Sequence, residues 1–238
     1  MSMKEKTQLT VEDKKMLKSI FWGSSFQYMS GAGPAHGAAS GFLRGILPAI
    51  KRFYPEKKRR GEAMTRHTTW YNCTLNLSTF IMGLVAAMER ESSEHDDFDT
   101  SSISAVKAAL MGPLSGIGDG FFWGVMRVVA AGIAMSLAAQ GSIAAPFVFL
   151  LIYNVPSFFV RYKLTFLGYT VGTGFLKEVY DSGAIKILTK AAAVLGLFVL
   201  GAMTANTVSF STTLSIPVNG GEAVAIQPYI DEMFMGLI

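Results

Sequence analysis

The chain has 238 residues, of which 50% are hydrophobic and only 16% charged, and its mean hydropathy is +0.36. Soluble domains usually carry roughly 25% charged residues, so the composition argues against a soluble domain and indicates an integral membrane protein. The net charge is +4, but the basic residues cluster in the first twenty residues and in residues 51–60. Because no polar domain accompanies these bases, a nucleic-acid-binding protein is excluded as the primary interpretation.

The N-terminal segment predicts a polar leader followed by an amphipathic helix, together residues 1–26. Residues 1–15 lack the apolar core of a signal peptide, so no cleaved signal peptide is expected. Thr10 followed by Asp13 has the spacing of a capping box and predicts a helix start. The helix would carry apolar residues opposite lysines, which suits a membrane surface, a partner or an ordinary surface helix.

A glycine-rich stretch follows, with glycines four residues apart at Gly33, Gly37, Gly41 and Gly45. The same spacing returns in residues 112–124, and two interpretations stay open. One is an internal repeat, as in transporters built from two related halves, and the other is coincidence in a chain rich in glycine and alanine. His36 is either a ligand or proton relay, or a hydrogen-bonding residue at a membrane interface, which is the commoner case.

The basic cluster at residues 51–60 is typical of a segment beside the membrane on its cytoplasmic side, or in contact with anionic lipid. Asn72 precedes an apolar run at residues 75–88 that is shorter than the ~20 residues needed to span a bilayer. We therefore expect a re-entrant segment or a buried helix there.

Residues 89–102 are acidic and polar. His95, Asp96, Asp97 and Asp99 could suggest a metal site, but acidic runs on solvated loops are far commoner, and no second ligand cluster is present. We expect no metal. The single cysteine, Cys73, excludes an intrachain disulfide.

The most distinctive stretch is GPLSGIGDGFFWG, residues 112–124. It predicts a helix break and a small-residue packing ridge, formed by Gly112, Pro113, Gly116, Gly118, Gly120 and Gly124. Asp119 would either cap the helix that begins at Phe121 or open onto a transport pathway. Trp123 and Arg127 are four residues apart and should share a helix face. A phosphate-binding loop is rejected because no lysine follows.

The apolar regions predict membrane spans at residues 121–139, 143–160 and 191–208. Arg161 to Lys163 are expected to anchor the second span at the interface, and residues 166–190 to lie along it. Near-alternation around residues 219–221 predicts a β-hairpin. The fold class is therefore mainly α: a polytopic membrane protein with broken or re-entrant helices and a short C-terminal hairpin. Residues 27–208 form the membrane domain, and residues 209–238 the hairpin and the start of a further segment.

Catalytic motifs are missing from the sequence. It has no nucleophile elbow, no phosphate-cradling lysine motif and no paired His/Cys spacing. We therefore expect a chain that is not an enzyme by itself and that uses no cofactor.

Several motifs together resemble the IID subunit of the mannose-family sugar phosphotransferase system. They are KAALMGPLSGIGDGFFWGVMR, LPAIKRFYP, RHTTWYN and ILTKAAAVLGLFVLGAM. The resemblance covers roughly residues 15–235 and implies a multi-pass subunit of the bacterial cytoplasmic membrane. It implies a hetero-oligomer with a IIC subunit that translocates a hexose or amino sugar, while a IIB unit of the cytoplasmic IIAB phosphocarrier phosphorylates it.

Two departures from the family pattern are expected to matter. The Trp-Asn-aromatic-Glu-Arg stretch usual in the family is replaced by SFQYMSGAGPAHGAA, and the chain ends at Ile238, which suggests truncation. We take five residues as candidates for the substrate pathway: Asp119, Trp123, Arg127, Asn72 and His36. The alternatives are a membrane scaffold or receptor that presents a docking face to partner proteins, and an ion-coupled transporter that uses Asp119 and Arg127.

Overall fold

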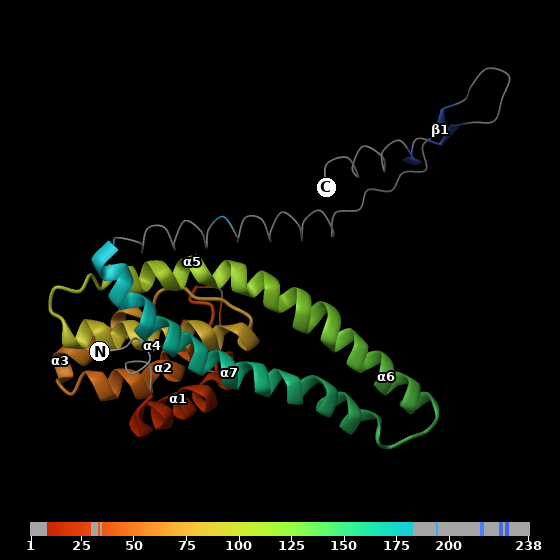
Figure 1. Ribbon diagram of the computed structural model, residues 1–238. Coiled ribbons are helices and arrows are strands. Elements are labelled where there is room, and N and C mark those ends of the chain that lie inside the picture. Colours follow the sequence, from red (N-terminus) through yellow and green to blue (C-terminus); the bar gives the residue numbers. More distant parts are fainter. Residues whose placement is uncertain are drawn as a thin grey trace.

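The computed structural model describes residues 9–29, 33, 35–182, 194, 215–216, 224–225 and 227–228. The elements within these residues, labelled in Figure 1, are α1 (Val11–Ser24), α2 (Ala39–Phe53), α3 (Lys57–Arg66), α4 (Leu75–Glu94), α5 (Ser101–Gly118), the π-helix η1 (Asp119–Met126), α6 (Arg127–Ala139), α7 (Ala145–Ser182), β1 (Ser215–Ile216) and β2 (Val224–Ala225). The described part of the chain is thus mainly helical, as predicted.

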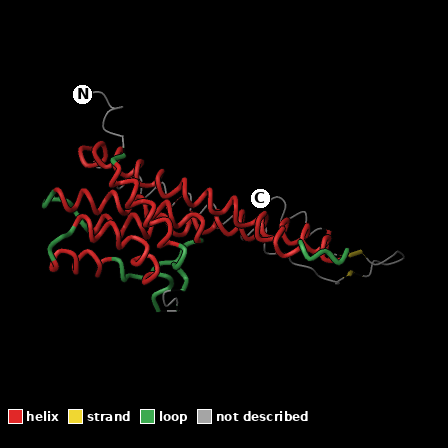
Figure 2. Tube along the Cα trace, turned by 90° about the horizontal axis from the view of Figure 1, so that it is seen from below, coloured by secondary structure: helices red, strands yellow, loops and turns green. Residues whose placement is uncertain are grey.

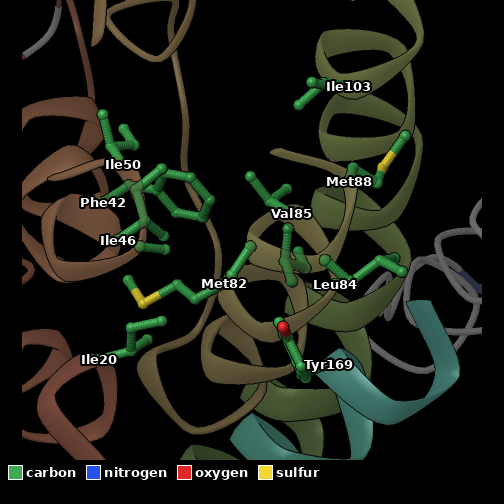
Figure 3. Packing of buried hydrophobic residues seen from close by; sticks show 14 of the residues in the cluster. Ile20, Phe42, Ile46, Ile50, Met82, Leu84, Val85, Met88, Ile103 and Tyr169 are labelled. Atoms are coloured by element: carbon green, nitrogen blue, oxygen red, sulfur yellow. The ribbon is translucent and has the colours of Figure 1, made fainter. Parts of the chain in front are cut away.

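The helices form a bundle from which one long helical hairpin projects. Figures 1 and 2 show α1 to α4 gathered at one end, with α6 and the first half of α7 extending away from them. Helix α4 packs against α1, α2, α5 and α7 and contributes much of the buried core. Figure 3 shows this core, where Phe42 of α2, Met82 of α4 and Tyr169 of α7 are all buried. Of the two predictions for residues 75–88, the buried helix is therefore the one observed.

Helix α1 begins with the predicted capping box. The Thr10 hydroxyl accepts a hydrogen bond from the Asp13 backbone N–H at 3.1 Å, and the Asp13 carboxylate accepts one from the Thr10 N–H at 3.1 Å. The apolar face, including Leu17 and Ile20, is buried against the chain's own bundle. This face is therefore occupied by the protein core, and only the lysine-bearing face of α1 is exposed.

Helices α4 and α7 cross at a close approach that two glycines permit. A Cβ atom at Gly83 would lie 2.2 Å from the Thr165 carbonyl oxygen, and one at Gly168 would lie 2.1 Å from the Phe80 carbonyl oxygen. Since real Cβ atoms do not approach a backbone oxygen so closely, both positions require glycine for backbones to pack in this way.

The predicted break in the glycine-rich stretch is not formed. One continuous helical stretch runs from Ser101 to Ala139 through α5, η1 and α6, and Gly118 and Asp119 both have helical dihedral angles. Gly118 instead allows a close helix contact, because a Cβ there would lie 2.7 Å from the Thr74 Cβ. The prediction failed because glycine serves packing here, and the local irregularity is a π-helical segment rather than an interruption.

The two glycine series differ in backbone structure. Gly33 donates its N–H to the Gly37 carbonyl at 3.1 Å in a turn before α2, and Gly37 has a positive φ of 58°. Gly112 to Gly124 lie within helices. This difference gives the internal-repeat interpretation no support.

Two helical stretches are long and apolar enough to cross a membrane, judged by length and composition. They are Ser101–Ala139 and Ala145–Thr173, with mean hydropathies of 1.7 and 1.3. Only 11% and 17% of an apolar 18-residue segment of each stretch is buried within the chain. The two stretches include the predicted span at 121–139 and all but the first two residues of the span predicted at 143–160. Pro156 lies inside α7 without ending it. Residues 166–182 continue α7 as one helix with the second candidate span, and the predicted position of residues 166–190 along the interface stays a prediction. The predicted third span, at 191–208, lies almost entirely outside the described residues.

The C-terminal part contains one short pairing. Strands β1 and β2 are antiparallel, with Ser215 opposite Ala225 and Ile216 opposite Val224. The residues between them lie outside the described part, so the predicted hairpin stays a prediction, as do the domain boundaries at residues 26 and 208.

Candidate functional site

A pocket of about 310 Å³ lies where the start of α4 meets η1 and the middle of α7. Its wall combines amide, hydroxyl and charged groups with aromatic rings, the mixture typical of small-molecule sites. The lining residues are Tyr28, Asn72, Thr74, Leu75, Asn76, Ser115, Asp119, Trp123, Tyr153, Asn154, Ser157, Phe158 and Arg161.

Asp119 is the acidic residue of this pocket. Its Oδ1 accepts a hydrogen bond from the Thr74 hydroxyl at 2.5 Å, and its Oδ2 accepts one from the Ser115 hydroxyl at 3.1 Å. The expected capping role is wrong, because the helix is continuous at this point and offers no free N-terminal amides. Each carboxylate oxygen has two lone pairs, so Asp119 retains capacity to accept further hydrogen bonds.

Trp123 and Arg127 lie together as their spacing predicts. The Arg127 Cζ is 4.6 Å from the centroid of the Trp123 ring. Trp123 lines the pocket and is 49% exposed, whereas Arg127 lies one turn further along the helix and is not among the lining residues. Trp123 therefore contributes an aromatic ring to the pocket wall, and the Arg127 guanidinium lies against that ring.

The two remaining candidates, Asn72 and His36, differ in their position relative to the pocket. Asn72 lines the pocket, and its Oδ1 lies 3.4 Å from the Tyr28 hydroxyl. His36 does not line it, and its side chain is exposed in the turn before α2. The His36 carbonyl accepts a hydrogen bond from the Tyr71 N–H at 3.4 Å. The structure thus brings together Asp119, Trp123 and Asn72, with Arg127 adjoining, and leaves His36 apart.

Several polar residues of the pocket are not among those predicted from the sequence. Asn76 donates to the Ser157 hydroxyl at 2.5 Å, which links α4 to α7, and Asn154 and Arg161 lie on the same face of α7. Arg161 is only 4% exposed, so the predicted interfacial anchor is wrong at this residue. The sequence does contain a feature that could have identified them, because they are single polar residues inside apolar runs. Such residues usually face a protein interior or a cavity.

A second polar cluster is buried at Glu89, which the sequence predicts to lie in a solvated loop. Glu89 belongs to α4, where its Oε1 lies 2.7 Å from the His67 Nε2 and its Oε2 accepts a hydrogen bond from the Tyr54 hydroxyl at 2.8 Å. Arg66 adds an ion pair at 3.4 Å. Glu89 thus has partners in the residue after α2, in α3 and in the residue after α3, so this cluster joins these elements to the core helix.

The predicted acidic loop carries ordinary surface pairs. Arg59 pairs with Asp96 at 3.3 Å, and His95 lies 3.2 Å from Glu91. Among the residues that the structure describes, no group of three or more His, Cys, Asp or Glu could hold a metal ion.

Comparison with known proteins gives consistent matches over nearly the whole chain. Residues 11–238 match the family described as "PTS system mannose/fructose/sorbose family IID component". The chain is 37% identical to the fructose permease IID component of Bacillus subtilis, over 91% of this chain and 75% of that protein. It is 32% identical to the mannose-specific EIID component of Escherichia coli, over 99% of this chain and 82% of that protein.

Solved structures agree with the sequence matches. The chain is similar to one in the cryo-EM structure of the mannose transporter ManYZ in complex with microcin E492. The TM-score is 0.79 at 29% identity, over 95% of this chain and 83% of that one.

Proposed function

The chain belongs to the mannose/fructose/sorbose family of phosphotransferase-system IID components, the non-catalytic membrane subunits of these sugar transporters, and from this we propose its substrate and partners. The subunit translocates a hexose or amino sugar together with a IIC subunit. A IIB unit of a cytoplasmic IIAB phosphocarrier phosphorylates the sugar. Relatives named for fructose, mannose and sorbose support a hexose.

The pocket at Asp119 is the part of the sugar path that this subunit contributes. The observation that carries this proposal is the convergence of Asp119 with the amides of Asn72 and Asn76 beside the Trp123 ring. A sugar offers hydroxyl groups that both donate and accept hydrogen bonds, and apolar C–H faces that pack on aromatic rings. Carboxylate, amide and indole groups are complementary to those features.

The assembly lies in the bacterial cytoplasmic membrane. The α6–α7 hairpin exposes large apolar side chains, including Phe147, Leu151 and Phe159, which suit membrane lipid and the IIC subunit. The basic residues 51–60 face the cytoplasm. We expect a IIC subunit to copurify with this chain from membranes.

Substitution of Asp119 tests the proposed pocket. Asp119→Asn, coexpressed with IIC and IIAB in a strain lacking such transporters, should lower phosphoenolpyruvate-dependent uptake of labelled mannose, fructose or sorbose about tenfold or more. A hydrogen bond to a charged group contributes about 1.5–3 kcal/mol, and tenfold corresponds to about 1.4 kcal/mol. Copurification with IIC should be unchanged.

The control is Asp96→Asn, which removes a surface carboxylate whose side chain is 94% exposed. It should leave uptake unchanged. Transport by Asp119→Asn at the wild-type rate would remove Asp119 from the sugar path. Uptake that needs an ion gradient instead of phosphoenolpyruvate would favour the ion-coupled alternative.

The receptor alternative has one specific observation in its favour. The solved ManYZ relative was determined in complex with microcin E492, so a protein of this family does present a docking face. If this chain acts as a receptor without transport, cells that produce it together with IIC and IIAB should bind the microcin but take up none of the three sugars.

A further inference from the structure

We propose that Arg161 is a sugar-binding residue and forms the hydrogen-bond-donating side of the pocket, where Asp119 forms the accepting side. This inference rests on the proposed function and identifies the ligand as a neutral polyol that contacts both charges. Arg161 comes from the middle of α7, within the second candidate span, and lines the pocket together with Asp119.

The hydrogen bonds of Arg161 leave part of its guanidinium free. Its Nη2 donates to the Ser24 hydroxyl at 2.7 Å and to the Ser25 hydroxyl at 3.0 Å. Its Nε is buried and has no hydrogen-bond partner among the described residues. A guanidinium has five N–H donors, and the two serines accept hydrogen bonds only from those on Nη2.

The charge of Arg161 is also uncompensated by an acid. No Asp or Glu among the described residues forms an ion pair with it. Its Cζ lies 5.4 Å from the centroids of the Phe21 and Phe158 rings, which hold the side chain in place. A buried cation is costly in an apolar segment and is usually kept where it contacts a substrate or an ion path. A link to two serine hydroxyls alone would not need a guanidinium.

The start of α4 adds donors on the same wall. Thr74 precedes α4 but makes no side-chain cap, since its hydroxyl lies against Asp119 instead. Leu75 and Asn76, the first two residues of α4, line the pocket. As the first residues of the helix, they have no partner within the helix for their backbone N–H groups, and no side chain caps the helix start. Free amides at a helix start favour oxygen lone pairs, as does the neighbouring guanidinium.

The pocket therefore has one accepting group, the Asp119 carboxylate, and a donor-rich region formed by Arg161 and the α4 N-terminus. A molecule whose hydroxyls donate at one side and accept at the other satisfies both. The two opposite charges balance within the pocket, which fits an uncharged sugar better than a sugar acid or a free amine.

The test uses the IIC–IID complex with its phosphocarrier and the sugar, among labelled mannose, fructose and sorbose, that the wild type takes up fastest. Arg161→Gln should raise the KM for this sugar at least tenfold, and Arg161→Lys should recover part of the loss. A series of mono-deoxy analogues should show one hydroxyl whose removal weakens wild-type uptake but has no further effect in Arg161→Gln. If Arg161 had only a structural role, Arg161→Gln would not specifically remove the difference in uptake between the sugar and one of its mono-deoxy analogues.

The matched control is Lys163→Gln, which removes a cation two residues further along α7 whose side chain is exposed and does not line the pocket. This variant should keep the wild-type KM. If it reproduces the effect of Arg161→Gln, or if Arg161→Gln keeps the full pattern of deoxy-analogue discrimination, the inference is wrong. If the wild-type complex takes up none of the three sugars, it is the proposed function that fails.

Discussion

At the residue scale, the buried cluster around Glu89 shows how single polar groups tie the bundle together. The side chains of His67 and Glu89 are both 0% exposed, and the His67 Nδ1 has no hydrogen-bond partner among the described residues. Burial disfavours the imidazolium and lowers the pKa of His67 below its usual value of 6.5, although the nearby Glu89 opposes this shift. His67 is therefore neutral in the folded protein at neutral pH.

This burial predicts that acidification destabilises the protein. In the unfolded chain His67 binds a proton as the pH falls through about 6.5, whereas the folded chain resists protonation to lower pH. Stability should therefore be full well above pH 6.5 and should fall as the pH decreases through 6.5 and below. Thermal unfolding of the purified subunit in detergent at a series of pH values measures this.

The matched variants are His67→Gln and His36→Gln. Glutamine at position 67 can still donate to Glu89 but does not titrate, so the pH dependence in this window should become flatter. His36 is exposed, so its substitution should leave the pH profile unchanged. An identical slope in wild type and His67→Gln would show that other groups cause the acid sensitivity.

At the scale of elements, the crossing of α4 and α7 determines where the pocket lies. Gly83 and Gly168 face each other's helix at backbone distance, and the Asn76–Ser157 hydrogen bond continues the same contact toward the pocket. Because the two helices approach closely, Asn76 on α4 and Arg161 on α7 line one pocket. If α4 and α7 crossed at a greater distance, the pocket walls that carry Asn76 and Arg161 would be further apart.

Substitution of either glycine should therefore destabilise the subunit. Gly83→Ala or Gly168→Ala forces the backbones apart, and overpacking of this kind costs about 1–3 kcal/mol. The melting temperature in detergent should fall, and uptake should fall with it. Gly61→Ala in α3 is the control, because a Cβ there meets nothing within 4 Å. That change should be neutral or stabilise the subunit by up to about 1 kcal/mol. Equal melting temperatures for all three variants would contradict the close-packing argument.

At the scale of the whole molecule, the chain divides into a packed bundle and a projecting hairpin (Figure 1). The bundle carries the basic helix α3, and the hairpin turns at residues 140–144, between α6 and α7. If both candidate spans cross the bilayer, the hairpin turn lies on the opposite side from α3. The excess of lysine and arginine in residues 51–60 predicts that α3 lies on the cytoplasmic side.

Cysteine labelling tests this orientation. Lys57→Cys should react with an impermeant thiol reagent only after the cells are opened, whereas Ile143→Cys at the exposed hairpin turn should react in intact cells. Ile143 is 84% exposed, and the single native cysteine, Cys73, is fully buried and provides a low background. Rapid labelling of Lys57→Cys in intact cells would reverse the orientation.

The sequence by itself determined the features that depend on local chemistry. Overall apolarity predicted a membrane protein, Thr10 and Asp13 predicted the capping box, and the spacing of Trp123 and Arg127 predicted their contact. The motifs around residues 112–124 resembled the IID family, which the comparisons confirm. Each of these features depends on composition, on neighbours within a few residues or on a short motif. All three can be read from a single sequence.

Only the tertiary structure decided the features that depend on distant neighbours. Glycine at position 118 is compatible with a helix break or with close packing, and the presence of Thr74 beside it decides for packing. Arg161 and Glu89 are charged, so their sequence context suggested exposed positions. Both are buried because residues more than twenty positions away supply hydroxyl, imidazole and guanidinium partners. Whether a polar group is stable inside a protein depends on partners that only the folded chain brings together.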